Sequence, residues 1–418
     1  MSIQHQPTTS STAASGMLSV DQAQQRIMAL ATPITTQERL HLRAALGRVL
    51  ASDITSSINV PPYANSAMDG YAVRCDDLSD TSATLRVSGS SFAGKTFSGA
   101  VEAGCCVRIM TGAVIPAGAN TVIMQERVKR IDDTITVEGR QNLGMNVRQI
   151  GEDISVGSVV LATGRRLVPA DIGLIASLGV GEVSVLRRIR VAFFSTGDEL
   201  RSIGEPLAEG QIYDSNRYTL YGMLSRLGVD LIDMGVIPDQ RARIENAFLD
   251  AAQAADVVIT SGGVSVGDAD YVKETLDKVG NVDFWKIAMK PGKPLAYGKV
   301  QQALFFGLPG NPVSVMATFY QFVQPALRRL TGETEALTLT IKVPCSNPLK
   351  KQPGRTDFQR GLLTRNVNGE LTVDSTGLQG SHVLSSMSRA NCFIILPAEC
   401  GNVPAGTLVE VQPFDGLI

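Results

Sequence analysis

Histidine and paired cysteines are what this sequence most clearly lacks. It contains three histidines and six cysteines among 418 residues, and no two cysteines have CxxC spacing. A zinc site built from cysteine and histidine is therefore not expected, and neither is a disulfide framework in a chain of this length. We expect reduced thiols that lie mostly in hydrophobic cores.

An excess of charge of either sign is also missing. Lys and Arg number 38 against 40 Asp and Glu, which gives a formal net charge of −2. Such a balance offers no broad basic surface for nucleic acid or for a membrane. Any anion that binds here must be held by local groups.

Long apolar runs are absent as well. No run of about 18 apolar residues marks a membrane span. Residues 1–16 are polar and rich in Ser and Thr, and they lack the apolar stretch of a signal peptide. They predict a disordered tail on a protein that is cytoplasmic by default.

The composition and the hydrophobic pattern change several times along the chain, and the chain is too long for a single hydrophobic core. We expect an α/β multidomain fold, with a central doubly wound, mostly parallel α/β domain, an inserted mostly β domain, a helical or mixed N-terminal domain and a small C-terminal β-barrel. The expected boundaries are 1–16 for the tail, 17–56 with 153–186 for the N-terminal and dimerisation domain, 57–152 for the insertion, 187–330 for the α/β domain and 331–418 for the barrel.

Local signals indicate how the first two domains begin. Ser19 and Gln22 have the spacing of a capping box, which predicts the start of a helix. An amphipathic segment over Leu42–Ala51 predicts a second helix, and Ala170–Leu178 a third. Between 57 and 152, short apolar runs separated by Gly, Pro and Asp-Asp turns are typical of β structure.

Residues 187–330 alternate between strand and helix patterns. This alternation predicts a parallel sheet with helices on both faces, whose ligands bind outside the carboxyl ends of the strands. The expected strands are Arg190–Ser195, Val229–Val236 and Val257–Thr260, and the expected helices are Asn216–Leu227, Arg241–Ala255, Tyr271–Val279 and Pro312–Leu330.

Three loops at these strand ends are candidates for a ligand site: Ser195–Leu200, Ser261–Tyr271 and Gly307–Ser314. Glycines in the second loop let backbone N–H groups approach an anion, and a helix N-terminus follows. Asp268 and Asp270 beside it could bridge a hard cation to phosphate oxygens. An ordinary strand–loop–helix connection, with Asp270 as a plain N-cap, remains the alternative.

The third loop places Pro312 at a helix start and Ser314 in its first turn, which predicts free N–H groups there. Lys286, Lys290 and Lys293 lie between the second and third loops, around a Pro-Gly pair. They present ammonium groups beside two anion-binding loops, and a solvated turn is the alternative.

In the last domain, Arg355 could clamp an oxyanion with two parallel hydrogen bonds. It could equally pair with Asp357 on a sheet surface.

Seven motifs now stand in order along residues 17–418: NSAMDGYAV, RIMTGA, GEDI, FSTGDEL, SGGVSVGDADY, KPGKP and LPGNPVS. In this order they resemble the molybdopterin molybdenumtransferase family, which includes the bacterial molybdenum insertase and the E domain of gephyrin. The sequence departs from the family at two positions, because Ala64 stands where Asp is usual and Ser215 where Thr is usual.

The resemblance implies that adenylyl-molybdopterin and molybdate are converted, with Mg²⁺, into AMP and molybdenum cofactor. Assistance from the metal and from local electrostatics would suffice, so no protein nucleophile is required. Glu199 and Asp270 are implied to hold Mg²⁺ or the adenylate end. The positions implied to matter for catalysis are Asp69, Thr111, Asp153, Glu199, Asp239 and Asp270.

The resemblance also implies two groups of substrate-binding residues. The pterin-phosphate end is implied to lie over Gly262, Gly263, Ser265, Gly267, Asp268, Pro309 and Pro312. Molybdate and the dithiolene are implied to lie against Lys286, Lys290, Lys293, Ser314, Arg355 and Ser381.

A homodimer is implied too, in which Asp69, Thr111 and Asp153 face the other chain's cleft, and a molybdopterin adenylyltransferase is a possible partner. Two other functions remain open. One is adenylyl transfer itself, whose enzymes resemble only 187–330, so that the β segments speak against it. The other is a non-catalytic dimeric scaffold, which normally needs longer linkers than this chain has.

Overall fold

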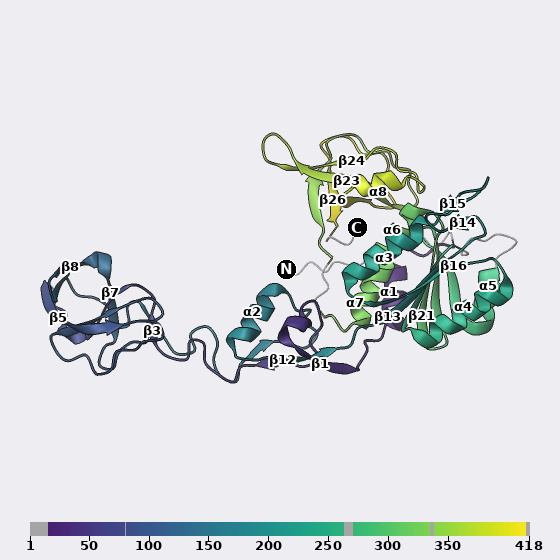
Figure 1. Cartoon of the computed structure of the whole chain (residues 1–418). Helices are drawn as coiled ribbons and strands as arrows, with labels where there is room; N and C mark the ends of the chain where they lie inside the picture. The colour runs from purple at the N-terminus through teal and green to yellow at the C-terminus, as the bar shows by residue number, and fades with distance from the viewer. Residues whose placement is uncertain (1–15, 80, 263–270, 335–337, 415–418) are drawn as a thin grey trace, which may run out of the picture.

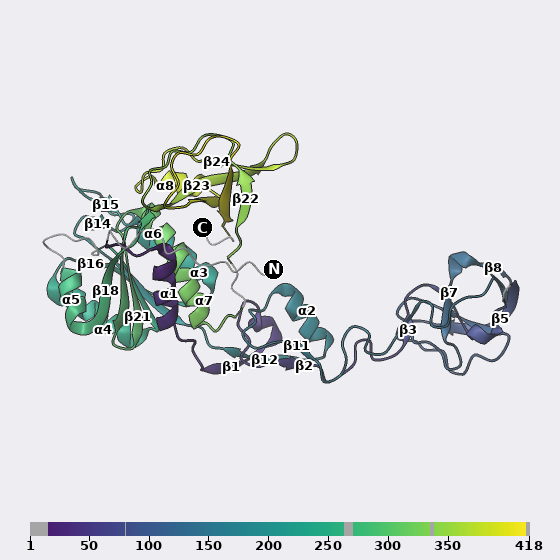
Figure 2. The same cartoon turned by 180° about the vertical axis from the view of Figure 1, so that it is seen from behind.

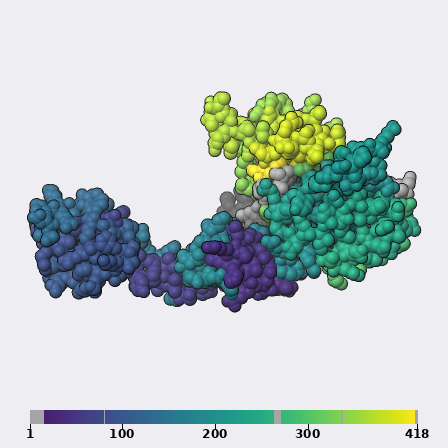
Figure 3. Space-filling view, viewed as in Figure 1, coloured from purple at the N-terminus to yellow at the C-terminus, as the bar shows by residue number. Residues whose placement is uncertain are grey.

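The computed structural model describes residues 16–79, 81–262, 271–334 and 338–414, so the expected tail lies almost wholly outside the described residues. The molecule is elongated (Figures 1 and 3): a β unit at one end is joined through a narrow middle region to an α/β unit, on which the C-terminal β unit stands. All six cysteines are free, and four of them are buried. None of the helices in the described ranges combines the length and the apolar character needed to span a bilayer.

The first helix, α1 (Val20–Leu30), begins where the sequence predicts. The hydroxyl of Ser19 accepts the N–H of Gln22 at 3.1 Å, and the Gln22 side chain accepts the N–H of Ser19 at 3.0 Å, so the capping box is confirmed. Ala23 and Ile27 are buried in the same apolar cluster as Phe193 of the α/β unit. The helix therefore belongs to the core that supports the central sheet.

The middle region consists of short strand pairs and one helix. Its elements are β1 (Gln37–His41), which pairs with β12 (Glu182–Leu186), β2 (Ile54–Thr55), which pairs with β11 (Val159–Leu161), and α2 (Pro169–Ser177).

The helix expected over Leu42–Ala51 is wrong, because only a 3₁₀ turn over Leu42–Ala45 forms. Gly47 takes a φ of +75°, which ends the turn. Beyond it, the N–H of Leu50 donates to Arg165 O at 2.9 Å. Pairing with a distant segment thus overrides the local amphipathic pattern.

The inserted unit is a six-stranded sheet in the order β7-β4-β6-β5-β9-β8, as its Gly- and Asp-punctuated pattern predicts. One face buries Tyr71, Cys106 and Ile135. A two-stranded ribbon of β3 (Asn65–Ser66) and β10 (Val147–Arg148) lies beside it. The sheet strands are β4 (Gly70–Val73), β5 (Ser82–Ser91), β6 (Cys105–Ile109), β7 (Thr121–Met124), β8 (Val128–Ile131) and β9 (Thr134–Glu138).

The central sheet has the order β16-β13-β17-β21-β20-β18. Its first four strands are parallel, but β20 pairs antiparallel with both of its neighbours, β21 and β18, so the expected parallel sheet holds for only part of it. Only Gln301 and Gln302 separate β20 from β21, and such a short link allows a hairpin but no parallel crossover. The strands are β13 (Arg190–Thr196), β16 (Asp230–Ile237), β17 (Val257–Ser261), β18 (Gly280–Lys286), β20 (Pro294–Val300) and β21 (Ala303–Leu308).

Helices cover both faces of this sheet, as expected. On one face α1, α3, α6 and α7 enclose the larger apolar cluster, and on the other α4 and α5 enclose a second. Gly228, at φ +71°, ends α3 where the sequence predicts. The expected helix Pro312–Leu330 contains one wider π turn at Phe319–Val323. The bounds are α3 (Ser215–Leu227), α4 (Arg241–Ala254), α5 (Tyr271–Val279), α6 (Pro312–Thr318) and α7 (Gln324–Leu330).

The C-terminal unit is a sheet in the order β19-β23-β25-β26-β22, with β24 paired to β23. Its first strand, β19, comes from the lysine-rich turn of the α/β unit and connects the two units. Helix α8 was not expected. The elements are β19 (Met289–Lys290), β22 (Ile341–Pro344), β23 (Thr356–Arg365), β24 (Leu371–Ser375), α8 (Leu384–Arg389), β25 (Cys392–Leu396) and β26 (Leu408–Pro413).

Asp256, at the start of β17, binds the segment that leads into β13, the first strand of the central sheet along the chain. Its carboxylate accepts two hydrogen bonds from Arg187, at 2.7 and 2.8 Å, and one from the N–H of Arg190 at 2.8 Å. Burial raises the pKa of Asp256, but these hydrogen bonds and the charges of Arg187 and Arg190 outweigh it and lower the pKa overall.

Because folding lowers this pKa, Asp256 stabilises the fold above its unfolded pKa of about 3.9, and the contribution is lost as the pH falls through the folded pKa. We expect Asp256→Asn to lower the free energy of unfolding by about 2 kcal/mol at pH 7 and by less in acid. Urea unfolding between pH 3 and 7 measures this. Asp230→Asn, which removes an exposed pair with Arg188 at 3.8 Å, is the control. An equal loss in both variants, or a loss that does not depend on pH, would contradict the assignment.

Candidate functional site

A cavity of about 380 Å³ opens at the carboxyl ends of β13, β17 and β21. The α/β unit contributes most of its wall, from the segments that follow these strands and from the start of α3. The C-terminal unit contributes His382 and Leu384. The cavity therefore lies where the sheet topology predicts, between two units of one chain.

The floor of the cavity is backbone that only glycine allows. Gly262 has a φ of +91°, and a Cβ atom there would lie 2.7 Å from Thr196 O. The N–H of Gly262 donates to Leu308 O at 3.1 Å. Beneath it, the buried hydroxyls of Ser195 and Ser261 are 2.9 Å apart. These contacts connect the ends of the three strands.

Asp214 and the first turn of α3 form one wall. One carboxylate oxygen of Asp214 caps the helix by accepting the N–H of Arg217 at 3.2 Å. Its other oxygen is buried, lies 3.9 Å from Arg217 Nε in an ion pair and accepts no hydrogen bond from the described residues. The amide oxygen of Asn216 is also buried without a hydrogen bond from the described residues. The Asn216 amide donates to Gly310 O at 2.7 Å, which ties α3 to the third loop. Buried polar oxygens that lack a partner indicate a missing ligand.

Further carboxylates lie nearby. Glu199 lines the cavity, and the N–H of Asp239 donates to Asp198 at 3.2 Å. Burial raises the pKa of Asp239, and the charges of Asp198 and Glu199 raise it further. No three His, Cys, Asp or Glu residues of the described ranges are grouped so as to hold a metal ion.

The cavity brings together some of the predicted residues. Glu199, Gly262 and Pro312 line it, and Asp239 is close enough for the charge of Glu199 to raise its pKa. Predicted residues in the second loop lie outside the described residues; these are Gly263, Ser265, Gly267, Asp268 and Asp270.

The third loop differs from expectation in one respect. Pro312 begins α6 as predicted, and Pro309 and Ser314 are buried. The N–H of Val313, expected to be free for a ligand, donates to Ser381 O at 3.1 Å. Ser381 therefore secures the C-terminal unit against α6 through its backbone.

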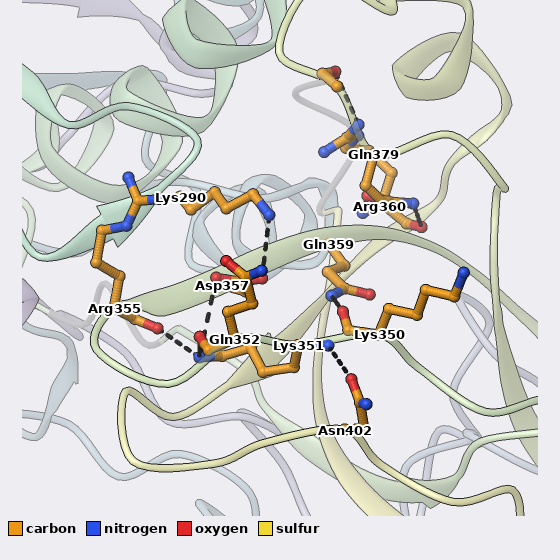
Figure 4. Close-up of polar contacts among 11 residues, drawn as sticks. Lys290, Lys350, Lys351, Gln352, Arg355, Asp357, Gln359, Arg360, Gln379 and Asn402 are labelled. Atoms are coloured by element: carbon orange, nitrogen blue, oxygen red, sulfur yellow. Dashed lines mark hydrogen bonds and ion pairs between the residues drawn. The ribbon is translucent and has the colours of Figure 1, made fainter.

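The three predicted lysines do not line the cavity. Lys286, Lys290 and Lys293 are exposed around the turn that leads into β19 and β20. Only Lys290 has an ion-pair partner in the part of the chain that the structure describes: its ammonium group lies 3.9 Å from the carboxylate of Asp357, a strand neighbour on β23 (Figure 4).

Asp357 also faces a second lysine. Lys351, whose side chain is fully buried, lies 4.0 Å from the other Asp357 oxygen and donates to Gln352 O and Arg355 O at 2.8 and 2.7 Å (Figure 4). The alternative pairing of Arg355 with Asp357 is therefore wrong. Arg355 is half-buried and forms no ion pair with the described residues, so its guanidinium is available for a ligand.

Arg360 is not among the substrate-binding residues that the resemblance implies, although it belongs to the same segment as Arg355. It is 1% exposed, and burial lowers its pKa to about 10. Its guanidinium donates to Ser386 Oγ at 3.0 Å, Leu378 O at 3.2 Å and Gly380 O at 3.0 Å, and no described carboxylate pairs with it. Arg360 thus fixes the loop that carries Ser381 and His382 to the cavity. The available signal was a second arginine five residues after Arg355.

We expect Arg360→Lys to retain the fold but to lower the proposed activity about tenfold, because one ammonium cannot bind three acceptors in the plane of a guanidinium. The loop should become more mobile, which hydrogen exchange at residues 378–386 can measure. Arg365→Lys, at the exposed end of the same strand, is the control. Normal exchange with lowered activity would show that Arg360 does not act by fixing the loop.

Asp69 and Thr111 form a pair in the inserted unit. Both the N–H and the hydroxyl of Thr111 donate to one oxygen of Asp69 at 2.8 Å, and these hydrogen bonds, the backbone one most, lower the pKa of Asp69. Asp153 borders a separate hollow of about 460 Å³, with Asn65 and Arg148. In Figures 1 and 2 the inserted unit lies at the far end of the molecule from the α/β unit. One chain therefore does not bring Asp69 and Thr111 to its own cavity.

Comparison with known proteins covers nearly the whole chain. Residues 18–179 match a family described as the MoeA N-terminal region (domain I and II), 192–329 a probable molybdopterin binding domain, and 342–414 the MoeA C-terminal region (domain IV).

Individual relatives give the same picture. A molybdopterin molybdenumtransferase of Haemophilus influenzae is 49% identical over 96% of this chain and 100% of its own length. One of Nostoc sp. is 36% identical over 86% of this chain and 85% of its own. A crystal structure of a molybdopterin biosynthesis moeA protein from Pyrococcus horikoshii is similar with a TM-score of 0.83, at 31% identity, over 95% of this chain and 100% of that one.

Proposed function

The chain belongs to the MoeA family of molybdopterin molybdenumtransferases, and on this premise we propose that it inserts molybdenum into molybdopterin. More finely, we propose that adenylyl-molybdopterin and molybdate are the substrates, and that AMP and molybdenum cofactor are the products. The observation that carries this proposal is the cavity at the strand ends, where the start of α3 meets a buried carboxylate oxygen that accepts no hydrogen bond from the described residues.

The phosphates of the substrate would bind at the start of α3 and over Gly262. The first N–H groups of a helix of 13 residues attract an anion. Glu199 and Asp214 on the same wall would repel it. A bound divalent cation resolves this conflict, because it is attracted to both.

The oxygen donors present fit Mg²⁺, which prefers carboxylates and substrate phosphates as ligands. The Asp214 oxygen that accepts no hydrogen bond from the described residues and the carboxylate of Glu199 would hold it, and Asp270 would complete the set from outside those residues. Mg²⁺ would withdraw charge from the phosphates and favour departure of AMP.

Molybdate and the dithiolene would lie at the junction between the α/β and C-terminal units. Lys286, Lys290 and Lys293 supply charge there, and Arg355 is a donor with no ion-pair partner among the described residues. Arg360 would act indirectly, by holding the loop of Ser381.

We further propose a homodimer in which Asp69, Thr111 and Asp153 reach the partner's cavity, with a molybdopterin adenylyltransferase as a possible supplier of substrate. Their distance from the cavity of their own chain supports this. Four apolar clusters each lie within one proposed domain and support the division. The largest cluster instead joins α1 and part of the C-terminal unit to the α/β unit. A bridge between Cys345 and Val373 brings β22 next to β24 and supports a closed C-terminal barrel.

Purified protein mixed with adenylyl-molybdopterin, molybdate and Mg²⁺ tests the function. We expect AMP release and activation of an apo-molybdoenzyme, both of which require molybdate. Formation of adenylyl-molybdopterin from ATP and molybdopterin without molybdate would instead indicate the adenylyltransferase. A dimer with neither activity would indicate the scaffold.

A further inference from the structure

The cavity has an apolar side that neither phosphate nor metal binding requires. Leu200, Ile212 and Tyr213 line it together with Gly262 and Asn311. Two of them are surprisingly open for apolar side chains, because Ile212 is 55% exposed and Tyr213 is 44% exposed. An apolar surface facing a polar one suits a ligand that is itself apolar at one end and anionic at the other.

The backbone under this surface is held firmly. β14 (Leu200–Arg201) and β15 (Ile212–Tyr213) pair in parallel. The N–H of Ile212 donates to Glu199 O at 2.9 Å, and the N–H of Asp214 to Arg201 O at 3.1 Å. Tyr213 therefore sits one residue before the carboxylate that caps α3, and directly beside the Glu199 segment.

The ring of Tyr213 is held as well. Its hydroxyl donates to Glu205 O at 2.9 Å, so the polar end of the side chain is satisfied within the arm that joins β14 to β15. A ring held at both ends loses little entropy when a flat ligand packs on it. The hydroxyl is also occupied, which leaves the ring face as the part of the side chain open to a ligand.

We propose that Tyr213, with Ile212 beside it, is the platform on which the adenine base of the adenylylated substrate packs. This rests on the proposed function, because it needs an adenylate in the cavity. A base stacked on Tyr213 directs its phosphate toward the first turn of α3, which starts two residues later. Stacking recognises the face of a base and not its edge, so the platform by itself accepts nucleotides as a class.

Titration calorimetry with AMP and with ribose 5-phosphate, both with Mg²⁺, tests the platform. Ribose 5-phosphate carries the same phosphate but no base. We expect Tyr213→Ala to weaken AMP binding about tenfold, the typical loss when a stacking side chain is removed. It should leave ribose 5-phosphate within about twofold of the wild-type value.

Two variants complete the design. Tyr213→Phe retains the ring and should bind AMP much as the wild type does. Tyr221→Ala removes a tyrosine that is 52% exposed on α3 and does not line the cavity, so it should change neither ligand. Circular dichroism checks that each variant is folded.

Unchanged AMP binding in Tyr213→Ala would overturn the platform while leaving the proposed function standing. An equal loss of AMP and ribose 5-phosphate would overturn it as well, because the phosphate end would then be affected and not the base. If the wild-type protein binds neither ligand, the adenylate substrate itself is wrong and the platform falls with it.

Discussion

Replacing Glu199 with glutamine is expected to lower molybdenum insertion at least about 100-fold, because it removes a charged ligand at the point where charge must be withdrawn from the phosphates. The substitution keeps the size of the side chain but replaces one acceptor oxygen of the carboxylate by an NH₂ donor. Glu199 lies on a loop at the edge of the cavity and is exposed, so the fold should not change. The measurement is AMP release from adenylyl-molybdopterin over a series of Mg²⁺ concentrations.

A metal ligand and a purely electrostatic residue give different curves in this series. Loss of a ligand shifts the Mg²⁺ requirement upward, and high Mg²⁺ restores part of the rate. The control is Glu209→Gln, an exposed glutamate on the same arm, which should match the wild type throughout. A lower rate in Glu199→Gln at an unchanged Mg²⁺ requirement would mean that Glu199 does not hold the metal.

The same substitution also changes the surroundings of Asp239. The negative charge of Glu199 is one of the causes that raise the pKa of Asp239, after burial and Asp198. Neutral glutamine should therefore bring this pKa down, even though no hydrogen bond joins the two residues. This adds a second readout to the variant that does not depend on any substrate.

The sequence predicted those parts of the fold whose signals are local. The capping box of Ser19, the end of α3 at Gly228 and the start of α6 at Pro312 depend on a few adjacent residues, and all three are confirmed. The helix predicted over Leu42–Ala51 does not form, because the backbone of Leu50 bonds to Arg165, which is distant in the sequence. The antiparallel pairing of β20 with β21 was missed because their hairpin turn contains two glutamines in place of typical turn residues.

The residues of the candidate site also fall into two groups, those that the sequence predicts and those that it does not. Glu199, Gly262 and Pro312 belong to loops that follow apolar strands, so the sheet topology alone places them together. Asp214 reaches the cavity as the cap of α3, and Tyr213 as part of the short β14–β15 ribbon. His382 comes from the C-terminal unit. None of these contacts can be read from spacing. Arg360 acts through three hydrogen-bond acceptors, two of them backbone carbonyls, and these leave no trace in the sequence.

Gly262 offers the sharpest test that the backbone itself forms the site. An alanine there must take a φ of +91°, and its Cβ would lie 2.7 Å from Thr196 O. A strained φ of this kind costs about 1–3 kcal/mol. The clash is with backbone, so relief requires the ends of β13 and β17 to move apart. A displacement of about 1 Å at a site that positions phosphates lowers the rate about 100-fold.

We therefore expect Gly262→Ala to lose about 100-fold in activity and also to unfold at a lower temperature. Gly310→Ala is the matched control, because Gly310 lines the same cavity but a Cβ there would meet no described atom within 4 Å. It should keep nearly full activity and stability. If Gly310→Ala were as damaging as Gly262→Ala, the cavity would be sensitive to any added methyl group. If Gly262→Ala were stable and active, the backbone of residue 262 would keep its conformation without glycine, and the strand-end floor would not be the phosphate site.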